Sequence, residues 1–487
     1  MNKVMLLYPP GRLYQRSEDR AQCNISDSAA ISVHACNDLG YCAAVLLKRG
    51  FQVFLKDYQT AGLSFDDAAA DVRSFQPDMI VLSTTNTSVI DDAAFLHRLT
   101  RIHPCVCVMK GAVFFDLSPD RLAQLDLSAV SCLVCCEIEF MIDALASYYL
   151  RNEGSLADLN GIMYKENGDF VKTPFVCAQN DLDSLPFPAR QLMDNALYVR
   201  PDTGEPMATI QTGLGCPSGC IYCLTPLISG RNVRTRSVDN VYREIEECYY
   251  TSGIRNFFFR ADTFTIDNEW AQALCDRIID SPLCGKIAFT ANSRVKPLSA
   301  ELLKKMKAAG CFTVAVGFES GSEETLSRIK KGATRADNLR AAKIIKAAGI
   351  PLFGFFIIGF PWESERHIKD TASLIREISP DFIELHIAMP FYGTMLYREC
   401  EAAGTLTGSA FGNDVYAPNT TGTLYLSTEE LQKWKRRILL RFYTKPGYIL
   451  KQFSAAIGKP VVIGNYIRYG VKLVLNNTVL KKKHRSD

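Results

Sequence analysis

The chain of 487 residues is 47% hydrophobic and 22% charged, a composition that excludes a disordered or fibrous protein. Its length exceeds what one hydrophobic core supports, so several domains are expected. The amino terminus, MNKVMLLYPPGR, lacks the apolar core of a signal peptide, and no window reaches the length of a membrane span, which predicts a cytoplasmic protein. The net charge of +3 is uneven, because residues 433–487 contain 14 Lys or Arg and a single acid, Asp487.

Residues 1–150 alternate short apolar runs with segments of helical length. The runs KVMLLY, FQVFLKD, DMIVLST, CVCVMKG and AVSCLVC are typical of buried strands, and CNDLGYCAAVLLKRG and DDAAFLHRLTRI have helical periodicity. Repeated strand-helix units predict a doubly wound parallel α/β domain of the Rossmann or flavodoxin-like type. Ligands of such domains bind at the carboxyl ends of the strands.

Residues 151–195 interrupt this alternation. The stretch NGIMYKENGDFVKTPF, residues 160–175, predicts a β-hairpin around the turn ENGD. The next stretch, DLDSLPFPAR, contains prolines that continue neither a helix nor a strand, so we interpret it as a linker.

Residues 196–400 contain a second series of strand-helix units. The strands are expected in MATIQTG, NFFFRAD, KIAFTAN, FTVAVGFES, PLFGFFIIGF and DFIELHIAM, with helices such as SVDNVYREIEECYY between them. Consecutive units of this kind predict a partial (β/α)6 barrel related to the TIM barrel, with its active residues at the carboxyl ends of the strands. Residues 401–487 are expected to form a basic helical region.

The stretch GLGCPSGCIYC, residues 213–223, places Cys216, Cys220 and Cys223 in the loop after the first strand of this second series. Most other cysteines are expected to be buried thiols, because nothing in the sequence directs the chain to an oxidising compartment. A structural zinc site needs four ligands, and no second cysteine pair accompanies the motif within the barrel segment. A cubane iron-sulfur cluster with three protein thiolates instead leaves one iron open to a small molecule.

The spacing Cys-x-x-x-Cys-x-x-Cys, with the aromatic Tyr222 before the last cysteine, resembles the signature of the radical S-adenosylmethionine enzymes. This resemblance implies a [4Fe-4S] cluster held by the three cysteines, with S-adenosylmethionine bound to the open iron. It also implies that an electron from an external donor cleaves the sulfonium to give a 5′-deoxyadenosyl radical, which takes hydrogen from the substrate. It assigns no individual catalytic side chain.

The same resemblance nominates cofactor contacts at the ends of the barrel strands. They are Tyr222 in the motif, Asp262 in FFFRADTF, Arg294 in TANSRV, and Glu319 and Ser320 in VGFESGSEETL. Other roles compete, since Glu319 could cap the following helix and Arg294 could pair with a carboxylate. The stretch GFFIIGFPWE resembles the family's adenine-contacting segment, with a place in the core as its alternative.

The order of the whole chain resembles the subgroup that places a cobalamin-binding domain before the radical domain, including its class B methyltransferases. The matching stretches are YPP, CEIEFMIDAL and DLDSLPFPAR. The resemblance implies cobalamin as a methyl carrier, without a histidine ligand because no Asp-x-His-x-x-Gly motif is present. Glycines of the subgroup are replaced by Lys110 in MKGAVF and by the CEIE of residues 136–139, where added side chains crowd a bulky ligand. A degenerate domain serving cobalamin-independent radical chemistry is therefore an alternative.

Two further alternatives come from other classes of function. A tRNA methylthiotransferase-like enzyme would hold a second cluster, for which the sequence offers Cys23, Cys36, Cys42, Cys105, Cys107, Cys132, Cys135 and Cys136. Such enzymes end in a small RNA-binding β-domain, whereas this chain ends in helical patterns, so nucleic acid is not expected as a partner. A sensor would bind S-adenosylmethionine without releasing 5′-deoxyadenosine.

The carboxyl-terminal segment mixes cations with apolar and aromatic residues, as in WKRRILLRFYTKPGYILKQF. A basic amphipathic helix of this kind predicts peripheral contact with an anionic membrane surface. The alternative is a helical cap packed on the barrel. Similar endings occur in members of the subgroup that act on hopanoid and tetrapyrrole-type substrates, which favours a small lipophilic substrate without naming it or its reaction.

Overall fold

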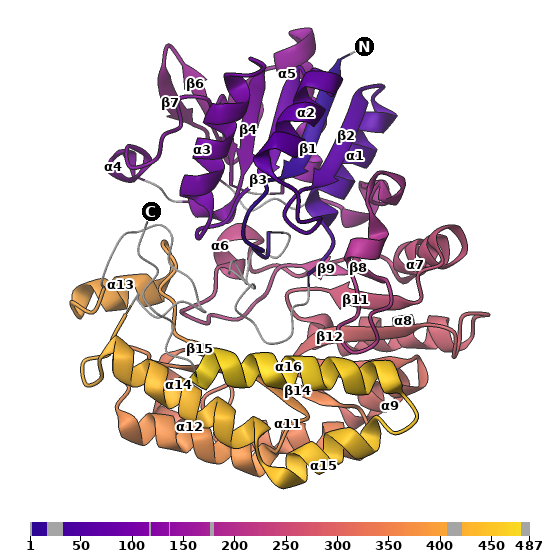
Figure 1. Ribbon diagram of the computed structural model, residues 1–487, viewed down its shortest axis with the longest axis vertical. Helices are drawn as coiled ribbons and strands as arrows, with labels where there is room; N and C mark the ends of the chain where they lie inside the picture. The colour runs from indigo at the N-terminus through magenta and orange to yellow at the C-terminus, as the bar shows by residue number, and fades with distance from the viewer. Residues whose placement is uncertain are drawn as a thin grey trace.

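The computed structural model describes residues 2–16, 33–115, 118–135, 137–175, 180–406 and 421–478. An amino-terminal domain stands above a barrel-like domain in Figure 1, and helices from the carboxyl-terminal region lie along the barrel. The predicted α/β class and the order of the domains are confirmed. Within the described residues, no helix is long and apolar enough to cross a bilayer.

Five parallel strands form the centre of the amino-terminal sheet, in the order β2-β1-β3-β4-β5. Their bounds are β1 Lys3–Tyr8, β2 Gln52–Asp57, β3 Met79–Ser83, β4 Val106–Lys110 and β5 Cys132–Val134. The strand order reverses between β1 and β3, which makes this edge the topological switch point where ligands of doubly wound folds bind.

Both faces of this sheet are covered, as the apolar strands require. Helices α1 (Asn37–Lys48) and α5 (Ile142–Arg151) share a core with Val4 and Leu6 of β1. Helices α2 (Phe65–Phe75) and α3 (Val89–Thr100) share the opposite core with Met5 and Leu7. Alternate residues of one strand therefore hold helices on opposite faces.

The predicted hairpin is present as β6 (Ile162–Glu166) and β7 (Asp169–Lys172), with Asn167 and Gly168 at positive φ in its turn. The sequence did not indicate its partner. Strand β6 pairs antiparallel with β5, so the hairpin extends the amino-terminal sheet to seven strands.

Six parallel strands form the second sheet, and all six were predicted. Its order is β8, β11, β12, β13, β14, β15, with bounds Met207–Gln211, Asn256–Arg260, Ala288–Arg294, Cys311–Glu319, Leu352–Ile358 and Phe382–Ile387. The outer helices are α7 (Val238–Ser252), α8 (Asn268–Ile279), α9 (Ala300–Ala308), α11 (Arg335–Ala347) and α12 (Glu365–Ile378). Shorter elements are α4 (Pro119–Leu122), α6 (Thr225–Ile228), α10 (Glu323–Arg328), α13 (Met395–Ala402) and the two-stranded pair β9 (Gly213–Leu214) and β10 (Arg234–Thr235).

The two sides of the barrel strands differ in burial. Residues facing the helices, such as Phe257, Phe259 and Phe289, are fully buried, and the rings of Phe259 and Phe289 stack at 4.5 Å. Alternate residues of β12, β14 and β15 are only partly buried. The side of these strands that faces away from the outer helices is therefore partly open to solvent.

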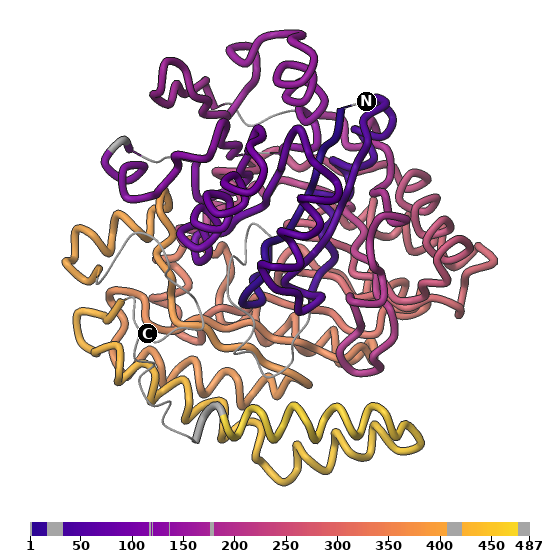
Figure 2. The backbone as a smooth tube through the Cα atoms, turned by 45° about the horizontal axis from the view of Figure 1, so that its top comes forward, coloured from indigo at the N-terminus to yellow at the C-terminus, as the bar shows by residue number. Residues whose placement is uncertain are grey.

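The carboxyl-terminal helices close the edge strand of the barrel. They are α14 (Thr428–Tyr443), α15 (Pro446–Ala455) and α16 (Pro460–Thr478), and Figures 1 and 2 show α15 and α16 in an outer layer. The Tyr443 hydroxyl donates to Ile383 O of β15 at 2.7 Å, and Tyr469 of α16 donates to Pro201 O ahead of β8 at 2.9 Å. The region thus joins both edges of the open sheet, which supports the cap among the two alternatives.

Candidate active site

The cluster loop, residues 213–223, is fixed by contacts to the next barrel strand. Gly215 has φ +90°, and a Cβ at this position would lie 2.0 Å from Asn232 O, so only glycine fits. Its amide donates to Asp262 Oδ2 at 2.7 Å, and the Thr225 hydroxyl donates to Asp262 Oδ1 at 3.0 Å. Asp262, nominated as a cofactor contact, thus lies at the site and holds the loop backbone.

The three cysteines of the motif differ in exposure, and Cys223 is partly exposed. Cys216 and Cys220 are buried, whereas Pro217 between them is exposed. Burial raises the pKa of the Cys223 thiol to about 11, although hydrogen bonds from Thr225 work against the increase. Because iron binds the thiolate, cluster binding must release this proton, and affinity for iron should rise with pH.

Within the described residues, no three His, Cys, Asp or Glu side chains converge closely enough to hold a single metal ion. This absence does not conflict with the predicted cluster. The three thiolates of a cubane bind three different irons and stand further apart than the ligands of one ion.

Arg294 and Glu319 join the site from neighbouring strands. Arg294 Nη1 is 3.4 Å from Cys220 Sγ, which places a cation where a thiolate would form, and its Nη2 donates to Lys331 O. Lys331 Nζ in turn donates to Glu319 Oε1 at 2.6 Å, with both side chains buried. Contacts therefore run from the cluster loop through Arg294 and Lys331 to Glu319. Lys331 was not found by the sequence analysis.

The backbone at Glu319 is strained. Its φ is +64°, and the register between β13 and β14 shifts between Gly317 and Glu319. A left-handed conformation costs a residue with a side chain about 1–3 kcal/mol and persists only where its surroundings enforce it. Such strain at the carboxyl end of a barrel strand is typical of a functional site.

Tyr222 and Ser320 have different surroundings. Tyr222 is partly buried, with its ring 6.1 Å from that of Phe360, and burial raises its pKa with a further contribution from Glu319. Ser320 is fully buried, and its hydroxyl lies 3.1 Å from that of Thr371 on α12. The structure thus places Tyr222 beside the site and Ser320 in the packing between strand and helix.

The segment GFFIIGFPWE ends in a buried carboxylate that the sequence analysis did not single out. Glu363 accepts hydrogen bonds from the amide of Gly359 at 2.6 Å and the hydroxyl of Thr325 at 2.9 Å. Burial raises the pKa of Glu363 to about 7. Phe360 and Trp362 pack against Ile221 of the cluster loop, so the segment supports that loop from below.

A second polar group occupies the switch-point edge, a name used here for Tyr8, Asp38, Ser83 and Lys110. The Tyr8 and Ser83 hydroxyls each donate to a different oxygen of Asp38 at 2.6 Å. Lys110 Nζ lies 3.6 Å from Asp38 Oδ2, and both side chains are buried. The lysine that replaces a family glycine is therefore built into an internal ion pair.

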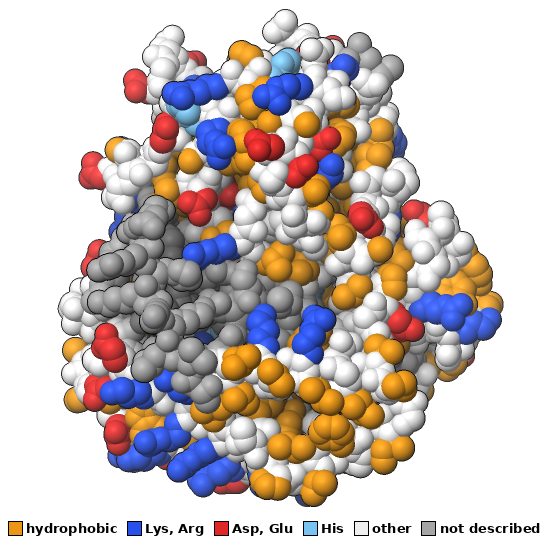
Figure 3. All heavy atoms as spheres, viewed as in Figure 1, with side chains coloured by type: hydrophobic (Ala, Val, Ile, Leu, Met, Phe, Trp, Pro, Cys, Tyr) orange, Lys and Arg blue, Asp and Glu red, His pale blue; other side chains and the backbone are white. Residues whose placement is uncertain are grey.

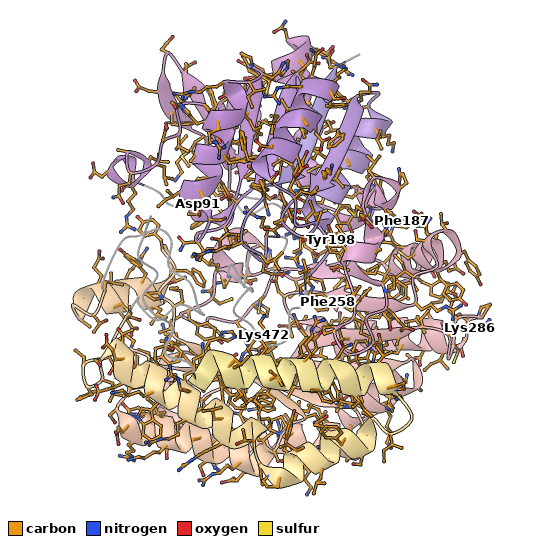
Figure 4. All side chains as sticks on the ribbon, in the orientation of Figure 1. Asp91, Phe187, Tyr198, Phe258, Lys286 and Lys472 are labelled. Atoms are coloured by element: carbon orange, nitrogen blue, oxygen red, sulfur yellow. The ribbon has the colours of Figure 1, made fainter. Side chains whose placement is uncertain are left out.

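Contacts between the domains adjoin this edge. Glu137, after β5, accepts two hydrogen bonds from the guanidinium of Arg234 on β10, one of them at 2.9 Å. Figure 4 labels Tyr198 and Phe258 at the boundary between the domains. Tyr198 donates to Asp57 at 3.1 Å, and the Phe258 ring packs on His34 at 4.6 Å. The amino-terminal domain thus rests directly on the elements that carry the cluster loop.

The cysteines considered for a second cluster are dispersed. Cys36, Cys42, Cys107, Cys132 and Cys135 are buried in the two cores of the amino-terminal domain, whereas Cys105 is partly exposed, and Cys23 and Cys136 lie outside the described residues. Burial raises the pKa of Cys132 to about 12, and burial also raises the pKa of Cys42 well above its usual value. These thiols are suited to packing rather than to iron ligation.

Comparison with known proteins identifies the second domain. Residues 210–375 match the model of the Radical SAM superfamily. An uncharacterized methyltransferase of Pyrococcus horikoshii is 28% identical over 413 residues, which cover 85% of this chain and 88% of the relative. The cytidylyl-2-hydroxyethylphosphonate methyltransferase of Streptomyces wedmorensis is 25% identical over 456 residues, covering 82% of each chain.

The fold of most of the chain is also found among solved structures. The radical S-adenosylmethionine methyltransferase TsrM from Kitasatospora setae, solved with cobalamin and a [4Fe-4S] cluster, has a TM-score of 0.64 at 18% identity. The match covers 84% of this chain and 76% of TsrM. At this identity the likeness establishes the fold alone. With the family match over residues 210–375 and the methyltransferase relatives, the chain is an enzyme that contains a Radical SAM domain.

Proposed function

We propose that this enzyme transfers a methyl group to a small-molecule substrate. In this proposal residues 196–400 hold a [4Fe-4S] cluster on Cys216, Cys220 and Cys223 together with S-adenosylmethionine, and residues 1–150 hold cobalamin. The cluster supplies the electron for reductive cleavage of S-adenosylmethionine, and cobalamin supplies a methyl carrier. The observation that carries the proposal is the ion pair between Glu137, after β5 of the amino-terminal domain, and Arg234, whose strand β10 pairs with β9 at the start of the cluster loop.

The chain's own residues prepare the cluster side. Asp262 fixes the loop through Gly215, so the sulfurs are positioned before iron arrives. Arg294 offsets the negative charge of the Cys220 thiolate at 3.4 Å. Glu319, held by Lys331, is a buried carboxylate suited to the hydroxyl or amino groups of S-adenosylmethionine. Tyr222 and Phe360 provide apolar surface beside it.

The switch-point edge supports cobalamin by its chemistry. Its hydroxyls, ammonium and carboxylate offer both donors and acceptors, which suits a macrocycle that carries amide side chains. At Gly111 the backbone approaches Thr84 so closely that a Cβ would lie 2.7 Å from Thr84 Cγ2, so the loop stays compact at the edge. In TsrM, whose fold is alike, cobalamin is bound. Lys110 must turn away from Asp38 or itself contact the corrin.

The substrate is proposed to lie in the barrel interior. Partly buried Phe353 and Phe355 of β14 offer apolar surface, and Glu384 and His386 of β15 form a polar pair with 3.6 Å between Oε2 and Nε2. An interior with both features fits a small molecule that combines an apolar body with a polar group. It supports the lipophilic substrate expected from the sequence.

The decisive experiment is anaerobic reconstitution with iron and sulfide, followed by hydroxocobalamin, S-adenosylmethionine and dithionite. Retention of one cluster and one corrin after desalting, with release of 5′-deoxyadenosine, is the expected result. A retained cluster with cleavage but no corrin would favour cobalamin-independent chemistry. Binding of S-adenosylmethionine without 5′-deoxyadenosine would favour a sensor.

We further propose that α15 and α16 contact an anionic membrane surface. Large apolar side chains are exposed along both helices and in the turn between them, led by Ile457 of the turn at 77% and Leu450 of α15 at 70%, and Figure 3 shows such side chains gathered over this region. Residues 433–478 carry ten Lys or Arg and no acid. An apolar face surrounded by cations is suited to the headgroup region of an anionic bilayer.

A further inference from the structure

Cys105 and Cys107 form a pair of thiols at the start of strand β4, in the stretch CVCVMK. Cys107 is fully buried in a core that it shares with Met109. Cys105 packs against the same core but is partly exposed. The two side chains therefore lie on one face of the sheet, as residues two positions apart in an extended chain do.

The two thiols interact directly, and they differ in ionisation. Cys107 Sγ lies 3.8 Å from Cys105 O, so the Cys107 thiol is turned back toward residue 105. A hydrogen bond from the Cys107 thiol lowers the pKa of Cys105 below its usual value, against the opposing effects of burial and Asp78. The same bond, together with burial, raises the pKa of Cys107 well above its usual value. Cys105 is thus the thiol that ionises first and that solvent reaches, whereas Cys107 stays protonated behind it.

The backbone permits the two sulfurs to be joined. An extended chain advances about 3.3 Å per residue, so the two Cα atoms are about 6.6 Å apart, within the range that a disulfide spans. Cys107 is fixed by Ser131, since its amide donates to Ser131 Oγ at 3.3 Å and its carbonyl accepts from the Ser131 amide at 2.8 Å. Pairing of β4 with β3 begins at Val106, so Cys105 can adjust its backbone while Cys107 stays in place.

The pair is remote from the proposed cofactor sites. Strand β4 ends at Lys110 on the switch-point edge, and the rise along the five residues from Cys105 is about 16 Å. Figure 1 shows the amino terminus, from which β1 starts parallel to its neighbours, on the side of the domain away from the barrel. Chemistry at the pair can therefore be followed separately from chemistry at the cluster loop.

We propose that Cys105 and Cys107 are a redox-active dithiol that small disulfides of the glutathione type oxidise. The Cys105 thiolate attacks one sulfur of the small disulfide, which forms a mixed disulfide and releases one small thiol. Cys107 then attacks the Cys105 sulfur, which closes the Cys105–Cys107 disulfide and releases the second small thiol.

The exchange is balanced and reversible. The protein loses two electrons and two protons, and the small disulfide gains both to become two thiols. An excess of small thiol drives both steps backward. No step uses an iron-sulfur cluster, S-adenosylmethionine or cobalamin, so the pair is independent of the proposed function.

The test treats the reconstituted holoenzyme with glutathione disulfide under anaerobic conditions. An acid quench stops the exchange, because the thiolate is the attacking species, and the chain is then unfolded in excess N-ethylmaleimide. Trypsin releases Cys105 and Cys107 together in residues 102–110, and it releases the exposed Cys284 as a control in residues 278–286. Mass spectrometry of the two peptides distinguishes the bridge, the mixed disulfide and the free thiols.

In wild type, residues 102–110 are expected without alkylation and lighter by two hydrogen atoms, whereas Cys284 should carry only a mixed disulfide. Cys107→Ser should accumulate the mixed disulfide on Cys105, because the second attacking thiol is absent. Cys105→Ser should lower modification of Cys107 at least about tenfold, because the remaining thiol is buried and protonated. Thermal unfolding verifies that both variants are folded.

Reduced glutathione should restore both thiols of the bridged peptide. A mixed disulfide on wild-type Cys105 that never proceeds to the bridge would overturn the proposal. Unmodified Cys105 under conditions that fully modify Cys284 would overturn it as well. Both readings come from wild-type protein, so they stand even where a variant fails to fold.

Discussion

The cluster loop and the switch-point edge lie on the two domains that the Glu137–Arg234 ion pair joins, yet they are prepared for their ligands in opposite ways. At the cluster loop, Gly215 at positive φ and its bond to Asp262 fix the backbone, and Arg294 lies beside the Cys220 thiol. These contacts leave the three thiols available to bind iron. At the switch-point edge the polar groups already satisfy one another, with Asp38 receiving Tyr8, Ser83 and Lys110. The cluster loop can therefore bind its ligand without losing these contacts. The groups of the switch-point edge must give up contacts with one another before they can contact a ligand.

The largest effect should come from removing one thiolate at the cluster loop. Cys220→Ala should abolish both the iron-sulfur absorbance and 5′-deoxyadenosine release, because a cubane on two protein ligands is not retained. Absorbance spectra and product analysis of the anaerobically reconstituted protein measure this. The matched control is Cys284→Ala, an exposed cysteine outside the loop, which should leave both unchanged. A Cys220 variant that kept both properties would refute the cluster assignment.

The next effect concerns Glu319, the strained residue that pairs with Lys331. Glu319→Ala leaves Lys331 buried without its carboxylate and should lower the free energy of unfolding by about 3 kcal/mol. Glu319→Gly loses the same ion pair but relieves the positive φ, so it should be more stable than the alanine variant by about 1 kcal/mol. Denaturant titration of both variants measures the difference. Equal stabilities would show that the backbone at this position carries no strain.

Buried carboxylates beside the cluster loop and beside the switch-point edge should make the free energy of unfolding depend on pH. Burial raises the pKa of Glu363, beside the cluster loop, and of Glu139, beside the switch-point edge, to about 7 in each case. A raised carboxyl pKa means that the folded state binds the proton more tightly, so stability falls as pH rises from about 4.5 through 7.

Glu363→Gln should therefore remove part of this pH dependence, gaining about 2 kcal/mol relative to wild type between pH 5 and pH 8. Glu139→Gln tests the carboxylate beside the switch-point edge in the same way. The free energy of unfolding, measured across this pH range, shows which of the two carboxylates contributes more to the pH dependence. An unchanged pH profile in Glu363→Gln would mean that this carboxyl is ionised throughout.

A smaller effect, on membrane binding, is expected at the carboxyl-terminal helices, away from both the cluster loop and the switch-point edge. Leu450→Ser with Ile457→Ser should weaken binding to phosphatidylglycerol-containing vesicles about tenfold, because less apolar surface enters the interface. Tyr250→Ser, an exposed aromatic on α7, is the control. Deletion of the region is unsuitable, because Leu431 and Ile438 belong to the barrel core. Vesicle binding that is unaltered by the double substitution would leave the region with its capping role alone.

The smallest change is expected at the switch-point edge itself. Lys110→Gly should not weaken hydroxocobalamin binding if the lysine crowds the ligand, since Asp38 keeps its bonds from Tyr8 and Ser83. Equilibrium dialysis of the apoprotein with the corrin measures this. Loss of binding would mean that Lys110 itself contacts the corrin. The switch-point edge would then, like the cluster loop, hold its ligand with a side chain that is already in place.

The amino-acid sequence by itself determined the fold class, the six barrel strands and the three cysteines. Strand length, apolar periodicity and cysteine spacing are local properties, and each carries its signal within a short window. The same holds for Gly215, whose turn composition marks the loop. Even so, the close approach of Asn232 O, which leaves no room for a Cβ at Gly215, is a tertiary contact that no such window shows.

Only the tertiary structure decided which side chains meet. Lys331 and Glu363 carry no motif, and became visible because distant segments bring them against Glu319 and Thr325. The pairing of the hairpin with β5 and the closure of the barrel edge by Tyr443 have the same origin. Burial and ion pairing depend on positions far apart in the chain, and such contacts exist only once the whole chain has packed.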